Sequence, residues 1–209
     1  MSTTINLSAR LLEQAHGEYV FARRVRVLSE RLAALLPPSA RVLDIGCGDG
    51  SIAACMMQLR PDVTITGLDV LVRPHTRIPV AQFNGTEIPY GDRSFDAVTF
   101  VDVLHHTDDP LVLLREAARV ARAAVVLKDH TQDGWLAGPT LRLMDYVGNA
   151  HHGVVLPYNY WPEQQWRAAF ATLGWRPSVW QAQLQLYPWP ANLFFDRTLH
   201  FVAKLEPEA

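Results

Sequence analysis

Apolar residues along the chain repeat with two spacings, and the two alternate from one segment to the next. Over residues 8–36 they recur every three or four positions, as in a helix that buries one face. The Pro37-Pro38 pair then ends the pattern. From residue 41 onward, short apolar runs of strand length alternate with longer runs of helical periodicity. This alternation predicts a Rossmann-like, doubly wound and mostly parallel α/β sheet with helices on both faces.

The individual elements follow from the same pattern. Strands are expected at residues 41–45, 63–70, 79–83, 95–101 and 123–128. Helices are expected at residues 51–60 and from 110 to about 122, and Asp109-Pro110 forms a typical start for the second of them.

The C-terminal part of the chain shows a different pattern. Trp180, Ala182, Leu184 and Leu186 alternate with glutamines, which is typical of a half-buried strand over residues 180–186. Residues 199–205 alternate in the same way, and no helical pattern separates the two runs. We therefore expect two antiparallel strands that pair as a hairpin at the end of the sheet.

Residues 130–177 form the longest connection between expected strands, far longer than one crossover helix requires. All six tryptophans lie after residue 130. We interpret this segment as a cap within a single domain over residues 1–209. The other parts of that domain are a helical segment (1–37), a ligand-binding core (38–129) and the C-terminal hairpin (178–205).

Composition narrows the class of protein. The 209 residues carry a net charge of −2 and an isoelectric point near 6.4, which is not the basic character of a dedicated nucleic-acid binder. Only two cysteines occur, and the N-terminus has no basic region followed by an apolar core, so we expect a reduced, cytoplasmic protein. No apolar run reaches about 18 residues, which argues against a membrane span.

Three glycines at alternate positions follow the first expected strand in the stretch VLDIGCGDG. Their spacing, Gly46-x-Gly48-x-Gly50, is one residue shorter than the dinucleotide pattern G-x-G-x-x-G. Asp44 precedes them, and a carboxylate there disfavours a pyrophosphate but suits a cationic ligand. Asp69, at the end of the second strand, is placed to accept both hydroxyls of a ribose. An ordinary tight turn and a dinucleotide site are the alternative interpretations.

Four segments in order resemble the class I S-adenosylmethionine-dependent methyltransferases, especially the type 11 methyltransferase domain family. The first motif of that family, D-x-G-x-G-x-G, matches residues 44–50, and its second acidic position matches Asp69 in TGLDV. Its third and fourth segments match FNGTEIPYGDRSFDAV and FVDVLHHTDDP. The resemblance is close over residues 38–129 and covers the rest in architecture alone. It implies a seven-stranded sheet of order 3-2-1-4-5-7-6 with strand 7 antiparallel, which agrees with the expected hairpin.

The resemblance also implies S-adenosylmethionine as the cofactor and S-adenosylhomocysteine as the product. Asp44 would hold the ammonium of the methionine half, Asp69 the ribose diol and Asn84 the adenine amino group. Asn84 stands where the family usually has aspartate, so the acceptor oxygen is kept and the charge is lost. The implied cofactor-binding residues are Asp44, Gly46, Cys47, Gly48, Asp69, Val70, Asn84, Gly85, Val101 and Asp102.

The implied activity is an in-line displacement that moves the sulfonium methyl group to an O, N, S or C nucleophile. The acidic isoelectric point and the tryptophan-rich cap favour a small-molecule acceptor, with neither nucleic acid nor membrane as a partner, and the oligomeric state stays open. Two alternatives also stay open. One is methylation of RNA or protein, and the other is a scaffold or sensor that binds the cofactor without transfer.

Histidines at the carboxyl ends of expected strands are the candidate catalytic residues. His130 follows the fifth strand and is the first candidate for a general base, and His106 follows the fourth. The alternative interpretation of the segment around His130 is that Asp129 or Thr131 caps a helix. No metal is expected, because metal-dependent catechol-type enzymes need an Asp-Asn pair after the fifth strand, where this chain has Lys128-Asp129-His130.

Aromatic and imidazole side chains are the candidate acceptor contacts. Glycine and proline interrupt regular structure in NAHHGVVLPYNYW, so its side chains are free to converge on a pocket mouth, and simple packing over the sheet is the alternative. The candidate residues are His105, Tyr146, His151, His152, Tyr158, Tyr160 and Trp161. Arg23, Arg24 and Arg26 on the first helix are interpreted as a solvated charged face, and contact with an anionic substrate is the minor alternative.

Overall fold

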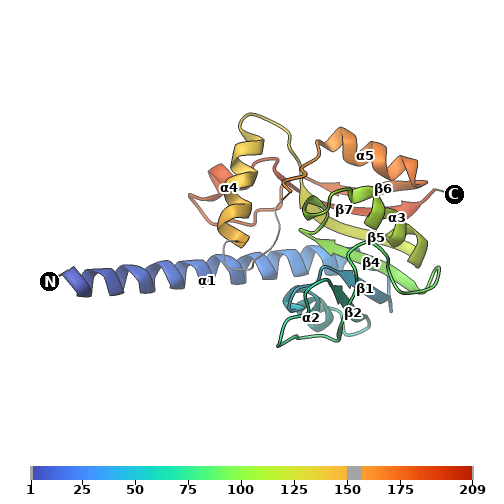
Figure 1. Ribbon diagram of the computed structural model, residues 1–209, viewed down its shortest axis with the longest axis horizontal. Helices are drawn as coiled ribbons and strands as arrows, with labels where there is room; N and C mark the ends of the chain where they lie inside the picture. Colours follow the sequence, from blue (N-terminus) through green and yellow to red (C-terminus); the bar gives the residue numbers. More distant parts are fainter. Residues whose placement is uncertain (1, 150–156, 209) are drawn as a thin grey trace.

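The computed structural model describes residues 2–149 and 157–208, and its strands form one seven-stranded sheet (Figure 1). The strands are β1 (Arg41–Ile45), β2 (Thr64–Asp69), β3 (Val80–Gln82), β4 (Phe95–Val101), β5 (Ala121–His130), β6 (Trp175–Gln181) and β7 (His200–Pro207). Their order is β3-β2-β1-β4-β5-β7-β6, and β7 runs antiparallel to both β5 and β6. The other neighbouring strands pair parallel. The predicted fold class and strand order are confirmed.

Helices cover both faces of the sheet. They are α1 (Ser2–Leu35), α2 (Ser51–Leu59), the short 3-10 turn η1 (Leu104–His106), α3 (Pro110–Val120), α4 (Ala137–Asn149), α5 (Glu163–Thr172) and α6 (Asn192–Phe195). Side chains of α1 and α2 pack with Val42 of β1, whereas those of α3 and α5 pack with the next residue, Leu43. Successive residues of a strand point to opposite faces, so one strand serves both hydrophobic layers.

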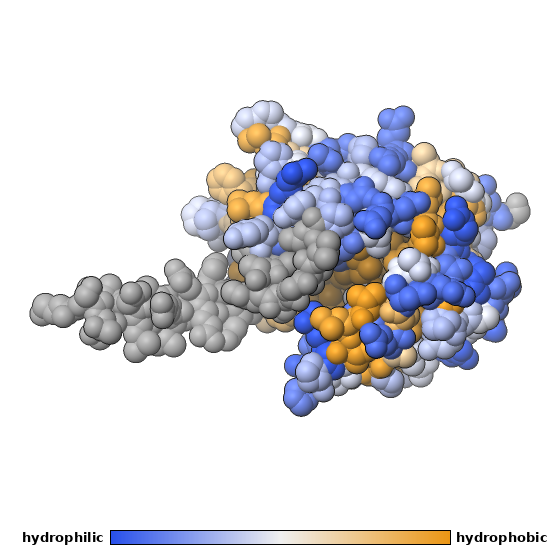
Figure 2. Space-filling view, in the orientation of Figure 1, coloured by the Kyte–Doolittle hydropathy of each residue, from blue (hydrophilic) through white to orange (hydrophobic). Residues whose placement is uncertain are grey.

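Hydrophilic residues cover most of the face shown in Figure 2, and hydrophobic residues form separate patches between them. Val70 and Leu71, directly after β2, are 54% and 55% exposed. Exposed apolar side chains next to a polar loop are typical of a ligand-binding rim. Within the described residues, we find no helix with the length and apolar character needed to span a bilayer.

The strand predicted over residues 180–186 is wrong. β6 covers Trp175–Gln181, and residues 182–186 have no regular structure. Leu184 and Leu186 are nevertheless buried, on the α1 side of the sheet. The Asp196 carboxylate accepts hydrogen bonds from the backbone N–H groups of Leu186 and Tyr187 at 2.8 and 2.9 Å, in place of a neighbouring strand. The alternation therefore reflects burial of a loop, while the antiparallel pairing of the last two strands is confirmed.

Two other predicted boundaries also move. α1 begins at Ser2 instead of residue 8, and β5 covers Ala121–His130 instead of residues 123–128. β5 is extended because Asp129 and His130 pair with Phe201 and His200 of β7. Asp129 is therefore a strand residue, and the alternative that it caps a helix is wrong.

The predicted start of α3 is confirmed, and it generates a stability test. The Asp109 carboxylate accepts a hydrogen bond from the Leu111 N–H at 2.9 Å, and Pro110 follows it. We expect Asp109→Ala to lower the free energy of unfolding by about 1 kcal/mol, because the first turn loses its cap. Urea denaturation would measure the change. Asp108→Ala, at the exposed neighbouring position, is the control, and equal losses in both variants would contradict the capping role.

Candidate functional site

The glycine loop after β1 is held against two neighbouring strands. The N–H groups of Gly46 and Cys47 both donate to the carbonyl of Leu68 in β2, at 2.7 and 3.3 Å. Gly46 has a φ of 67°, and a Cβ added there would lie 2.5 Å from a methyl group of Val103. Glycine is required at this position because the turn after β4 approaches the loop so closely.

Two further N–H groups of the loop also have partners within the protein. The Gly48 N–H donates to the Asp69 carboxylate at 2.8 Å, and the Gly50 N–H donates to the carbonyl of Cys47 at 2.9 Å. A pyrophosphate cradle needs free N–H donors, which these residues do not offer. A Cβ added at Gly48 would meet no atom within 4 Å, so the space beside the loop is open. The loop thus offers carboxylates and open space, which suits a cationic ligand.

Asp44 is the buried acid of this loop. Its side chain accepts a hydrogen bond from the Thr99 hydroxyl of β4 at 2.7 Å, and the residue is 4% exposed. Burial raises the pKa of Asp44 to about 7, and the charge of Asp69 adds to that rise, whereas the bond from Thr99 opposes it. Burial and the charge of Asp44 also raise the pKa of the Cys47 thiol, whose sulfur faces Gly67 of β2. A cation bound beside Asp44 would stabilise its ionised carboxylate and so lower its pKa.

The region implied for the adenosine lies at the ends of β2 and β3. Asp69 is half-buried, and its second carboxylate oxygen accepts the Leu71 N–H at 2.9 Å. A Cβ added at Gly85 would lie 3.1 Å from a methyl group of Val70, so these two residues are close neighbours. Asn84 is exposed, and its side-chain oxygen already accepts the backbone N–H groups of residues 86 and 87. The oxygen expected to meet an adenine amino group thus stabilises the turn.

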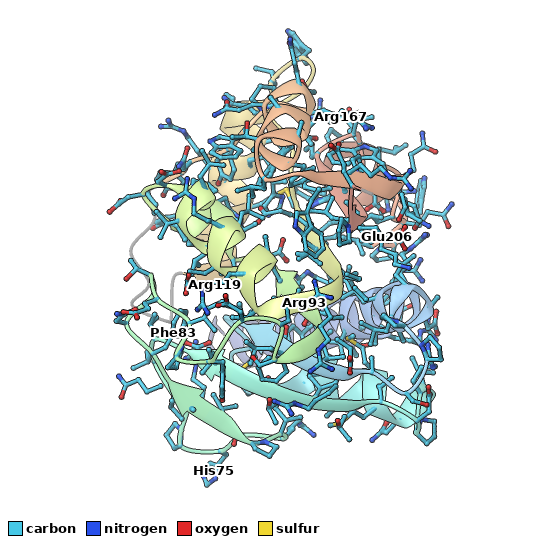
Figure 3. The ribbon with its side chains drawn as sticks, turned by 90° about the vertical axis from the view of Figure 1, so that its right-hand side faces the viewer. His75, Phe83, Arg93, Arg119, Arg167 and Glu206 are labelled. Carbon is cyan, nitrogen blue, oxygen red and sulfur yellow. The ribbon has the colours of Figure 1, made fainter. Side chains whose placement is uncertain are left out.

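Arg119 of α3 fixes the segment that follows this turn. Its guanidinium donates to the carbonyls of Ile88 and Tyr90, at 3.0 and 2.8 Å, and pairs with Glu116 (Figure 3). The Glu116 carboxylate in turn accepts the Ile88 N–H at 2.8 Å. α3 therefore positions the connection between β3 and β4.

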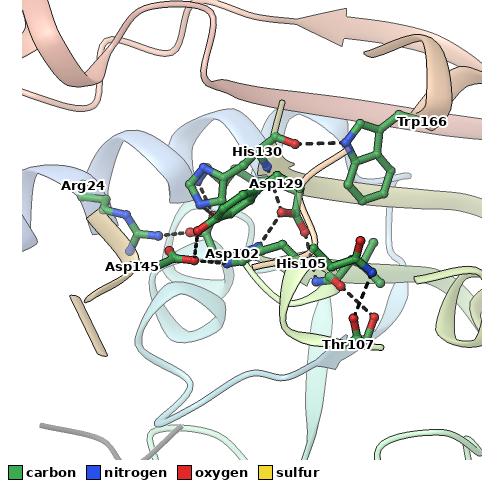
Figure 4. A network of polar contacts seen from close by, with 12 residues as sticks. Arg24, Asp102, His105, Thr107, Asp129, His130, Asp145 and Trp166 are labelled. Carbon is green, nitrogen blue, oxygen red and sulfur yellow. Dashed lines mark hydrogen bonds and ion pairs between the residues drawn. The ribbon is translucent and has the colours of Figure 1, made fainter. Parts of the chain in front are cut away.

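Asp102 lies at the centre of a charged cluster after β4 (Figure 4). One carboxylate oxygen pairs with Arg24 of α1 and the other with Lys128 of β5, and His130 Nε2 lies 3.3 Å from the latter oxygen. Burial alone would raise the pKa of Asp102, but the charges of Lys128 and Arg24 hold it well below its usual range. Val101, the last residue of β4, is half-buried beside this cluster. The interpretation of Arg24 as part of a solvated face is therefore wrong.

His105 of η1 lies between two carboxylates. Its Nδ1 is 2.6 Å from an oxygen of Asp129 in β5, and its Nε2 is 3.4 Å from Asp145 in α4. Asp145 also accepts the hydroxyl proton of Tyr160. Burial would lower the pKa of His105, but Asp129 and then Asp145 outweigh it and raise the pKa to about 10. His105 is thus an imidazolium ion at neutral pH and links the turn after β4 to α4.

The two candidate bases have different surroundings. Burial, and then the charge of His105, lowers the pKa of His106, which is half-buried. Burial lowers the pKa of His130 much further, and this residue is 5% exposed. The buried Nδ1 atoms of both rings have no hydrogen-bond partner among the described residues. Both rings are neutral at pH 7, and His106 is the more accessible.

The predicted acceptor contacts separate into distinct groups. His105 and Tyr160 stack with ring centroids 5.6 Å apart, and Tyr158 lies 6.3 Å from Tyr160. Trp161 packs in the hydrophobic core against Trp166, and Tyr146 is 64% exposed on α4. His151 and His152 lie outside the described residues.

Sequence reasoning missed three charged or titratable members of this site. Arg24, Lys128 and Asp145 were not singled out as site residues, although all three contact the clusters around Asp102 and His105. A lysine in an otherwise apolar strand was the one available signal, because a buried lysine needs a nearby counter-charge. Nothing in the local sequence marks Arg24 or Asp145.

Two sets of side chains lie close enough to share a metal ion. They are His105, Asp129 and His130, and His105, His106 and Asp145. His105 belongs to both, and its two ring nitrogens face Asp129 and Asp145. The protonated His105 ring therefore balances the charge of one of these two carboxylates before any ion binds.

The strand order, the acidic glycine loop and the charged ends of β4 and β5 define a class I methyltransferase-like fold. A family model described as a methyltransferase domain (Methyltransf_23) matches residues 15–179. The chain therefore belongs to the methyltransferase-domain family, and the predicted class I methyltransferase resemblance is confirmed.

Individual relatives are similar over part of the chain. The chain is 36% identical over 110 residues to a 27-O-demethylrifamycin SV methyltransferase of Amycolatopsis mediterranei, covering 46% of this chain and 40% of that protein. It is 33% identical over 98 residues to a ubiquinone biosynthesis O-methyltransferase of Xanthomonas campestris, covering 41% and 40%. The matches thus span about two fifths of each relative.

A solved structure shares the fold over nearly its whole length. Magnesium protoporphyrin IX methyltransferase from Synechocystis, solved with bound S-adenosylhomocysteine, aligns with a TM-score of 0.61 and 15% identity. The alignment covers 99% of this chain and 95% of that one. At this identity the likeness shows the fold alone.

Asp44 generates a test of pH-dependent stability. Its folded pKa of about 7 lies above the ordinary 3.8, so ionisation increasingly disfavours the folded state as pH rises between these values. We expect Asp44→Asn to raise the free energy of unfolding by roughly 2–3 kcal/mol at pH 8, with little gain at pH 4. Chemical denaturation at both pH values would measure this. Equal effects at the two pH values would contradict the buried, shifted carboxyl.

The His105 ion pair can be tested spectroscopically. We expect the His105 ring to remain doubly protonated at pH 8 and to lose a proton near pH 10 in histidine NMR titrations. Asp129→Asn removes the nearer charge, so the pKa should fall by one unit or more. Glu163→Gln, on the distant helix α5, is the control. A ring that already titrates near pH 6.5 in the native protein would contradict the assignment.

Proposed function

We propose that this chain is an S-adenosylmethionine-dependent O-methyltransferase that acts on a hydroxyl group of a small molecule. The observation that carries the proposal is the contact between Gly46 and Val103, because it brings an acidic, cation-accepting loop against the turn that holds His106. The names of two relatives, a 27-O-demethylrifamycin SV methyltransferase and a ubiquinone biosynthesis O-methyltransferase, support a hydroxyl acceptor.

The residues present fit the cofactor. Asp44 and Asp69 supply carboxylates for an ammonium and a ribose diol, and the space beside Gly48 is open. Val70 offers an exposed apolar surface for a purine ring. The bound cofactor would supply an activated methyl group on a sulfonium. Both carboxyl groups lose solvent on ligand binding, and a positive charge beside Asp44 favours its ionised form.

We assign the general base to His106. A hydroxyl acceptor loses its proton as its oxygen bonds to the methyl carbon and the carbon–sulfur bond breaks, and a neutral imidazole is suited to take that proton. His105 is already protonated, and His130 lies deeper and beside Asp102. His106 is neutral, half-buried and has an Nδ1 with no partner among the described residues. His105 and Asp129 act as positioning residues that hold the turn.

Two other functions make different predictions. A methyltransferase acting on RNA or protein would bind its substrate in a strongly salt-dependent manner. A scaffold or sensor would bind the cofactor and never form product. The small-molecule assignment is supported by the net charge of −2 and the names of the relatives. The proposed cytoplasmic setting is supported by the two free cysteines.

Calorimetry with S-adenosylhomocysteine tests the cofactor assignment. We expect the native protein to bind it, and Asp69→Ala to weaken binding at least about tenfold because the ribose diol loses its acceptor. Asp92→Ala, at an exposed position that pairs with Arg119, is the control. No binding by the native protein would refute the proposed function.

Transfer of a labelled methyl group to a library of small alcohols and phenols tests the base. With the acceptor so found, we expect His106→Asn to lower kcat by about 10²- to 10⁴-fold while binding of S-adenosylhomocysteine stays unchanged. The activity of the native protein should no longer increase with pH above about pH 7, because the pKa of His106 lies below 6.5. His75→Asn, an exposed histidine, is the control. Loss of activity in His130→Asn alone would assign the base to His130.

A further inference from the structure

Two histidines of the turn after β4 lie together with an acid of the cap helix. His105, His106 and Asp145 each offer one metal-binding atom, and these atoms lie within 4.8 Å of one another. His105 and Asp145 are 1% and 7% exposed, and His106 is half-buried. The Nε2 of His105 and the Nδ1 of His106 are buried and have no hydrogen-bond partner among the described residues. Unpartnered imidazole nitrogens and a carboxylate thus share one buried place.

The distance between His105 and Asp145 fits metal coordination better than it fits a hydrogen bond. The His105 Nε2 lies 3.4 Å from an Asp145 oxygen, whereas a charge-assisted hydrogen bond between such groups is about 2.7–2.9 Å long. Zinc binds nitrogen and oxygen at about 2.0–2.2 Å in tetrahedral geometry, so two of its ligand atoms are about 3.3–3.6 Å apart. The two atoms are therefore spaced like neighbouring ligands of one ion.

The opposite edge of the His105 ring is held as in a metal-binding histidine (Figure 4). Its Nδ1 lies 2.6 Å from an Asp129 oxygen, which also accepts the backbone N–H of His130 at 2.8 Å. The second Asp129 oxygen accepts the backbone N–H of Leu104 at 3.0 Å. Metal-binding histidines generally donate their other ring N–H to a carboxylate, which fixes the orientation of the ring. Asp129 thus holds the Nε2 of His105 toward Asp145.

The second set of close metal-binding atoms, from His105, Asp129 and His130, is less suitable. The 2.6 Å between His105 Nδ1 and Asp129 is a hydrogen-bond distance, and it is too short for two ligands of one tetrahedral ion. Both Asp129 oxygens also accept backbone N–H groups. These contacts favour the set that contains His106 and Asp145.

We propose that His105, His106 and Asp145 bind Zn²⁺ or a similar divalent transition-metal ion, and that the bound ion inhibits methyl transfer. Two imidazoles and a carboxylate are a typical ligand set for zinc, and they leave one position of a tetrahedral ion for water. The ion replaces the proton on His105 Nε2, which passes to the solvent, while Nδ1 keeps its proton and its bond to Asp129. The Tyr160 hydroxyl donates to Asp145 and so orients the carboxylate ligand.

The inhibitory effect rests on the proposed function. His106 accepts a proton from a hydroxyl only while one of its ring nitrogens has an available lone pair. Once either nitrogen binds the ion, the other carries the ring proton, and the ring no longer acts as a base. The ligand set also differs from the Asp-Asn pair on which we based the expectation of no metal, because two members are imidazoles and the third lies on the cap.

Calorimetry and visible spectroscopy test the site on the whole chain, stripped of metal with EDTA and without cofactor. The probes are Zn²⁺ and Co²⁺. We expect the native protein to bind one equivalent and the Co²⁺ form to show the visible bands of a four-coordinate ion. His106→Asn and Asp145→Asn should each weaken binding at least about tenfold. His75→Asn, at an exposed position, is the control.

Histidine NMR tests the same site without any variant, so the result does not depend on how the variants fold. Zn²⁺ should shift the ring signals of His105 and His106 and leave that of His75 unchanged. The proposal is overturned if the native protein binds neither ion. It is also overturned if His130→Asn weakens binding and His106→Asn does not, or if thiolate charge-transfer bands of Co²⁺ reveal cysteine ligands.

A transfer assay tests the inhibition. With an acceptor found as above, saturating Zn²⁺ should lower the kcat of the native protein to about that of His106→Asn, and EDTA should restore it. Unchanged or faster transfer with the site filled would overturn the inhibition. Failure of the proposed function gives a different result, because the native protein then binds Zn²⁺ at the three residues and does not bind S-adenosylhomocysteine.

Discussion

The need to pair buried charge at the carboxyl ends of β4 and β5 governs the arrangement of this protein. Asp102 and Asp129 end these neighbouring strands, and each is neutralised by a cation that another element brings to it. On one face of the sheet the cations are Arg24 and Lys128, and on the other face the cation is His105. A buried carboxylate without such a partner would be unstable. The same pairs therefore seat α1 on the sheet and fix the turn that bears the candidate base.

The local sequence predicts the parallel strands and the glycine loop well, and the family resemblance implies the strand order. Asp44, Gly46 and Asp69 lie at fixed spacings along consecutive elements, so their positions at the ends of β1 and β2 follow from short-range pattern. Val103 lies close to Gly46, so the turn after β4 packs against the glycine loop. These features depend on residues close in sequence or on the parallel order of the strands.

What the sequence could not show depends on contacts between distant segments. Arg24 meets Asp102 across 78 positions of the chain, and in the sequence it is one of three arginines that look equally solvated. The alternation at residues 180–186 predicted a strand because burial of every second residue looks the same in a strand and in a covered loop. In this protein the Asp196 carboxylate accepts the backbone N–H groups of Leu186 and Tyr187, so the segment is a loop. Such an interaction has no local signal.

The bridge from Asp129 through His105 to Asp145 joins the sheet to α4, and it makes the cap and the core interdependent. Without the His105 imidazolium, Asp145 would be a buried acid that accepts a hydrogen bond from Tyr160. Without Asp145, the Nε2 of His105 would face the cap with no carboxylate opposite it. A cap exchanged between members of this fold would therefore have to carry its own acid and tyrosine to these positions. In this chain the cap and the core are thus two matched surfaces, one on each side of a single histidine.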